Sequence, residues 1–78
     1  MSTYDRMEKR IEKLEKNIEK NREKIKELEM KFEEYKITEK RFDIKKRHLM
    51  EKIRTLDSQV RILKGGLVKQ KHHEEHNA

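Results

Sequence analysis

The feature that most constrains this chain is a stripe of apolar residues spaced alternately three and four positions apart. With Tyr4 at heptad position a, the spacing continues without a slip to Leu67. The a and d positions are Tyr4, Met7, Ile11, Leu14, Ile18, Asn21, Ile25, Leu28, Phe32, Tyr35, Glu39, Phe42, Lys46, Leu49, Ile53, Leu56, Val60, Leu63 and Leu67. Charged residues flank this seam, a pattern typical of coiled-coil packing rather than of a globular core.

Composition limits the alternatives. The 78 residues are 31% hydrophobic and 49% charged, which leaves too little apolar material for a three-dimensional core. The hydrophobes are phased rather than scattered, which argues against disorder. No Cys is present, which excludes disulfides and fits a reducing compartment. No apolar run approaches the roughly twenty residues of a membrane span, so we expect a cytoplasmic protein without a membrane partner.

Local signals predict a first helix over residues 3–35 and a turn over residues 36–38. Ser2 and Thr3 are natural N-caps for the first helix. Thr38 can cap a second helix. Ile37 before it and Phe42 after it have the N′ and N4 spacing of a hydrophobic staple.

The second helix is expected over residues 39–64. Gly65-Gly66 can end it, because Gly readily adopts the left-handed conformation that closes a helix. The coiled-coil domain therefore covers residues 1–67, and residues 68–78 form a mobile tail that contains His and Glu.

Two arrangements of the seam are open. One continuous helix in a parallel dimer would be about 95 Å long and would stack Glu39 and Lys46 each on its own copy, which is unfavourable. In an antiparallel hairpin Glu39 lies at the turn, Lys46 can extend its amine to solvent, and Phe32 packs against Phe42. We favour the all-α hairpin and expect it to self-associate, for example into a four-helix bundle.

The seam should supply both the hairpin contacts and the oligomer contacts. Its residues in this role are Ile11, Leu14, Ile18, Asn21, Ile25, Leu28, Phe32, Phe42, Leu49, Ile53, Leu56, Val60 and Leu63. Asn21 either penalises alternative registers as a buried amide or softens the seam beside water. The ion pairs expected in a hairpin are Glu15–Lys64, Arg22–Asp57 and Lys36–Asp43, whereas like charges meet at Lys24–Lys52 and Lys31–Lys45.

Charge is distributed unevenly along the chain. The net charge is +6, yet residues 1–39 carry eleven basic and eleven acidic residues. Residues 40–78 carry eleven basic and five acidic residues, which indicates an anionic partner, either an acidic protein face or nucleic acid. The candidate residues for this contact are Lys40, Arg41, Lys45, Lys46, Arg47, Lys52 and Arg54.

Catalysis is not indicated. The segment from His72 to His76 matches H-x-x-E-H, but no core or cleft can be built around it, so we expect no catalytic site, cofactor or dedicated metal site. The sequence predicts a non-enzymatic coiled-coil interaction or assembly module, a scaffold or adaptor with a basic second half. The alternative is a sequence-nonspecific nucleic-acid-binding protein that contacts phosphates through the basic second helix.

Overall fold

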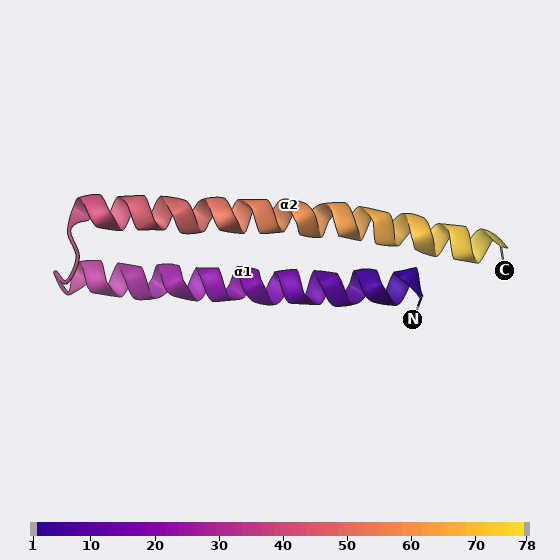
Figure 1. Cartoon of the computed structure of the whole chain (residues 1–78), viewed down its shortest axis with the longest axis horizontal. Coiled ribbons are helices and arrows are strands. Elements are labelled where there is room, and N and C mark those ends of the chain that lie inside the picture. Colours follow the sequence, from indigo (N-terminus) through magenta and orange to yellow (C-terminus); the bar gives the residue numbers. More distant parts are fainter. Residues whose placement is uncertain (1, 78) are drawn as a thin grey trace.

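The computed structural model describes residues 2–77, with side chains for residues 2–69. Two α-helices, α1 (Thr3–Glu33) and α2 (Glu39–Asn77), run antiparallel and pack along their length (Figure 1). Together they form a rod of 61 × 16 × 14 Å. The predicted hairpin is confirmed, and the continuous helix of about 95 Å is wrong.

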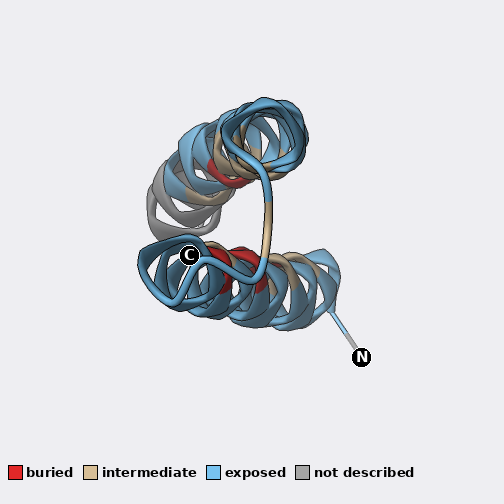
Figure 2. Ribbon diagram, turned by 90° about the vertical axis from the view of Figure 1, so that its left-hand side faces the viewer, coloured by how far each residue is buried: buried red, intermediate tan, exposed pale blue. Residues whose placement is uncertain are grey.

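The two helices face each other with their a and d positions. From Tyr4 to Leu28, and again from Phe42 to Leu67, every a and d residue is buried or half-buried. The most enclosed side chains are Ile11, Ile18, Asn21, Leu28 and Val60. In Figure 2 the buried segments of each helix lie on the side turned toward the other helix. Near the turn the seam opens, because Phe32, Tyr35 and Glu39 are exposed.

Side-chain caps start both helices as predicted. The Ser2 hydroxyl accepts a hydrogen bond from the backbone N–H of Asp5 at 3.2 Å. At α2 the Thr38 hydroxyl accepts from the N–H of Arg41 at 3.3 Å. Each cap satisfies a backbone donor that the first turn of a helix leaves without a partner.

The chain reverses through a Schellman motif that has tyrosine in place of the usual glycine. Helix α1 ends at Glu33, two residues earlier than predicted, and the turn spans residues 34–38. The N–H of Lys36 donates to the Lys31 carbonyl at 2.8 Å, and that of Tyr35 to the Phe32 carbonyl at 3.1 Å. Tyr35 has a φ of 60° and is 95% exposed. A left-handed conformation with a Cβ costs about 1–2 kcal/mol, and little packing offsets it here.

Substitution of Tyr35 by Gly should therefore stabilise the hairpin. We expect Tyr35→Gly to raise the free energy of unfolding by about 1 kcal/mol, because the Cβ penalty is removed and little side-chain burial is lost. Urea denaturation followed by circular dichroism measures the change. The control is Tyr35→Ala, which keeps the Cβ and should gain nothing. Equal effects of the two substitutions would show that the left-handed backbone is not the source of strain.

Two aromatic rings stack between the helices next to the turn. The rings of Phe32 and Phe42 stack with centroids 4.5 Å apart and an interplanar angle of 16°, as predicted for a hairpin. The Lys46 amine lies 5.5 Å from the centre of the Phe42 ring and 3.7 Å from a Glu29 carboxylate oxygen. The Lys46 side chain thus extends from its a position toward the surface, so its charge is not buried in the seam.

The prediction that Gly65-Gly66 ends the second helix is wrong, because α2 continues to Asn77. Neither glycine has a positive φ. The seam continues past them, and Leu67 packs against the core cluster of α1 and α2 residues, which offsets the low helix propensity of Gly. A Cβ on Gly66 would lie 2.7 Å from Cε of Met7, so this position allows close approach of α1. The side chains of residues 70–78, which make up most of the tail predicted to be mobile, lie outside the described residues.

The two glycines should respond differently to alanine. Gly65→Ala should raise the free energy of unfolding by about 1 kcal/mol, because its Cβ enters open space and improves helix propensity. Gly66→Ala should gain less, because the Met7 methyl must move away. Chemical denaturation of both variants gives the difference. In a Met7→Ala background the difference should vanish, and its persistence would contradict the steric explanation.

Candidate functional site

The candidate site is found on the two flanks beside the seam. In an antiparallel helix pair the c and g positions of both helices fall on one side, and the b and e positions fall on the other. Two neighbouring grooves between the helices place Lys24 with Lys52 and Lys31 with Lys45. The like-charge neighbours expected from the heptad pattern therefore do share grooves.

We call the c and g side the basic flank. Its charged residues within the described helices are Arg6, Arg10, Lys13, Lys20, Lys24, Glu27, Lys31, Arg41, Lys45, Lys52 and Lys69. These are ten bases and one acid, drawn from both helices. The lysine groove, defined by Lys24, Lys31, Lys45 and Lys52, is the central part of this flank, and none of these four forms an ion pair within residues 2–69.

Other side chains complete the lysine groove. His48 lies along both of its halves, and the apolar edge consists of Leu28, Ile44 and Leu49. Two acids also line it, Glu27 in the half that contains Lys31 and Glu51, from an f position, in the half that contains Lys52. Four ammonium groups without a carboxylate partner produce a positive potential that attracts anions.

The seven basic candidates from the sequence do not form one surface. Arg41, Lys45 and Lys52 lie on the basic flank, whereas three others occupy b positions on the opposite side. Those three are Lys40, Arg47 and Arg54, of which the last two line a shallow pocket with Met50. Lys46 is engaged with Glu29 and Phe42. The heptad pattern predicted that Lys24 lies near Lys52 and Lys31 near Lys45, but the candidates for the anionic contact did not include the two α1 lysines.

We call the b and e side the mixed flank. Its α1 half begins with an acidic row, and its α2 half carries a basic row. The acidic row is Asp5, Glu8, Glu12, Glu15 and Glu19, and the basic row is Lys40, Arg47, Arg54, Arg61 and Lys64. Over residues 3–33 and 39–69 this flank holds nine acids and seven bases, so its charges nearly cancel.

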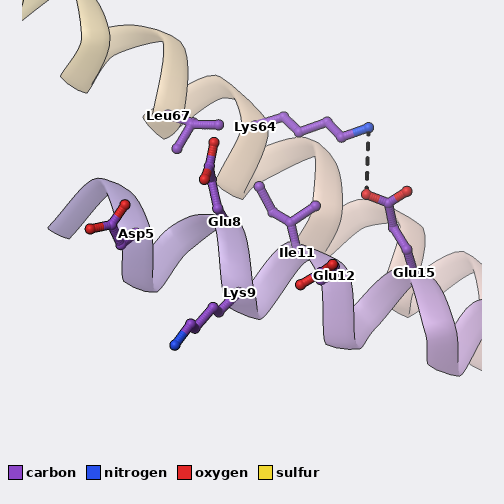
Figure 3. A pocket seen from close by; sticks show the side chains of 8 residues that line it. All are labelled: Asp5, Glu8, Lys9, Ile11, Glu12, Glu15, Lys64 and Leu67. Carbon is purple, nitrogen blue, oxygen red and sulfur yellow. Dashed lines mark ion pairs between the residues drawn. The ribbon is translucent and has the colours of Figure 1, made fainter. Parts of the chain in front are cut away.

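Figure 3 shows the open end of the mixed flank, where Glu8, Ile11 and Glu15 project from α1 toward α2. The Lys64 amine lies 3.9 Å from a Glu15 carboxylate oxygen, as expected. Two other expected pairs are wrong. Asp57 pairs with Arg61 at 3.2 Å rather than with Arg22, and Lys36 pairs with Glu34 at 2.8 Å rather than with Asp43. Both observed partners lie within four residues of each other in the sequence, and exposed pairs of either kind contribute only about 0–1 kcal/mol.

Asn21 is the one buried polar side chain among the described residues, at 5% exposure. Its amide nitrogen donates to the Asn17 carbonyl at 2.8 Å, one turn earlier in the same helix. The amide is thus satisfied within α1 and forms no hydrogen bond to α2. Of the two interpretations of Asn21, its burial favours the buried amide that lowers the stability of the seam and penalises alternative registers over a residue beside water.

Other chemistry has little support in the described part of the chain. Within residues 2–69, no three His, Asp or Glu side chains lie close enough together to hold a metal ion. The His72 to His76 side chains lie outside the described residues. None of the described helical segments is long and apolar enough to cross a membrane.

Comparison with known proteins adds no relative. No family model, curated protein or solved structure matches this chain. The two flanks are therefore the features from which function can be inferred.

Proposed function

We propose that this hairpin is a non-enzymatic coiled-coil assembly module that pairs with a second copy of itself through the mixed flank. The supporting observation is the division of this flank into an acidic row on α1 and a basic row on α2. In a two-fold symmetric contact the same surface meets itself. The acidic row of each copy can then lie against the basic row of the other, so that four helices form a bundle.

Incomplete burial of the seam gives a hydrophobic reason for pairing. Among the described residues no side chain is less than 2% exposed. Met50, at an e position beside the half-buried Ile53, is 55% exposed. Small folds with so little enclosed apolar surface commonly gain stability by oligomerisation. A second hairpin on the mixed flank would cover Met50 and the adjoining edge of the seam.

The basic flank is a poor surface for such a contact. Its ten bases and one acid would repel the same flank of another copy. The mixed flank reduces this repulsion, because acids predominate on its α1 half and bases on its α2 half.

Light scattering on a sizing column tests the proposal. At about 100 µM protein we expect a mass of at least twice the 9.7 kDa of one chain. Met50→Gln should shift the mass toward the monomer, because it places a polar group in the contact. The matched control is Met30→Gln, at an exposed f position on the face away from the seam, which should leave the mass unchanged. A monomeric wild-type protein at this concentration would overturn the proposal.

A further inference from the structure

We propose that the basic flank is a binding surface for duplex nucleic acid, contacted through its phosphates without sequence preference. This activity is separate from assembly, which uses the mixed flank. It also differs from binding by the second helix alone, because Lys24 and Lys31 of α1 complete the lysine groove.

The first argument is the excess of positive charge. The net charge of the whole chain is +6, and the basic flank alone carries ten bases against one acid. The mixed flank holds two more acids than bases and is in part internally neutralised, as in the Glu15–Lys64 pair. No surface of a second copy within the described residues can therefore match the charge of the basic flank. An external polyanion can match the charge of the basic flank.

The second argument is geometry. Successive g positions on a helix lie about 10.5 Å apart, so the lysines follow the rod in regular steps. The rod is 61 Å long and could lie along about 18 base pairs at 3.4 Å per step. A duplex carries about one negative charge per 1.7 Å of its axis, so phosphates face a rod that lies along it in every helical turn.

The third argument separates nucleic acid from an acidic protein. Protein interfaces have an apolar core, whereas phosphate contacts do not require one. Among the c and g positions and the apolar edge of the lysine groove, the exposed large apolar side chains are Ile44 and Ile62, which are too few for such a core. Aromatic residues are absent from these positions, so unpaired bases have no platform on which to stack. A duplex backbone fits this surface better than an acidic protein or a single strand.

The test compares two variants of equal charge. The flank variant carries Gln at all four residues of the lysine groove, Lys24, Lys31, Lys45 and Lys52. The control variant carries Gln at four bases that belong neither to the basic flank nor to the two rows of the mixed flank, Lys9, Lys16, Lys26 and Lys36. All eight side chains are exposed, and Gln retains helix propensity, so circular dichroism should show both variants folded.

Fluorescence anisotropy with two unrelated labelled duplexes of about 20 base pairs gives affinity at about 50 and 200 mM salt. The wild-type protein should bind both sequences equally and lose affinity steeply with salt. The flank variant should bind at least about 100-fold more weakly at the lower salt, and its salt slope should fall by about 3.6 if all four lysines contact phosphates. The control variant should keep most of the affinity.

Three outcomes would overturn the inference. One is no binding of the wild-type protein at the lower salt. Another is an equal loss in both variants, which would show that total charge rather than the basic flank determines binding. The third is displacement of the duplex by poly-glutamate at the same charge concentration, which would assign the surface to an acidic protein.

Discussion

Truncation of Ile18 to Ala should strongly destabilise the hairpin. Ile18 is 7% exposed and belongs to the core cluster with Ile11 and Val60. Loss of a buried isoleucine side chain to alanine costs about 2–5 kcal/mol, because a cavity adds to the lost transfer free energy. A domain with a typical stability of about 5–15 kcal/mol would lose a large share of it. The midpoint of urea denaturation reports the change.

The matched control for Ile18 is the same substitution at an exposed position. Ile62 is 74% exposed at a c position of α2. Ile62→Ala should change the free energy of unfolding by no more than about 0.5 kcal/mol. A large effect at Ile62 would mean that this side chain is buried in an assembly, and a small effect at Ile18 would contradict the seam.

Asn21→Leu should have a somewhat smaller effect, in the opposite direction. The leucine side chain has nearly the shape of asparagine, and the site is 5% exposed among apolar neighbours. Replacement removes a buried amide whose hydrogen bond is made within its own helix. We expect the free energy of unfolding to rise by about 2 kcal/mol. Because a buried Asn also disfavours alternative partners, the variant should show a broader range of oligomers by light scattering.

Asn17→Leu provides the control, since the same chemical change then falls on an exposed g position one turn away. Its stability should stay within about 0.5 kcal/mol of the wild type. If Asn21→Leu were destabilising, the hydrogen bond to Asn17 would contribute more than burial of a leucine side chain.

The hairpin could be derived from sequence because local and periodic signals agree. The alternating spacing placed the seam, the caps at Ser2 and Thr38 placed the helix starts, and the charge of Lys46 favoured a fold that leaves it near solvent. The end of α2 could not be derived in this way. Glycine permits a helix end without requiring one, and packing of Leu67 decided the outcome.

The candidate surfaces were harder to predict than the fold. Counting charge along the chain assigned the excess to the second half, whereas the folded molecule gathers it on one flank of both helices. Lys24 and Lys31 lie in a half whose charges sum to zero, so a linear count could not detect them. Only the pairing of α1 with α2 brings them beside Lys45 and Lys52.

The tyrosine at the chain reversal has a consequence for how two molecules can combine. Neither Gly nor Pro lies in the segment from Glu34 to Thr38, and the heptad spacing passes through it unbroken. Straightening this segment into helix would release the strain at Tyr35 while keeping every a and d residue in register. Two chains could then exchange arms in a domain-swapped dimer that reproduces the same α1 to α2 contacts between molecules. A left-handed tyrosine thus makes the closed hairpin more prone to swapping than a glycine would.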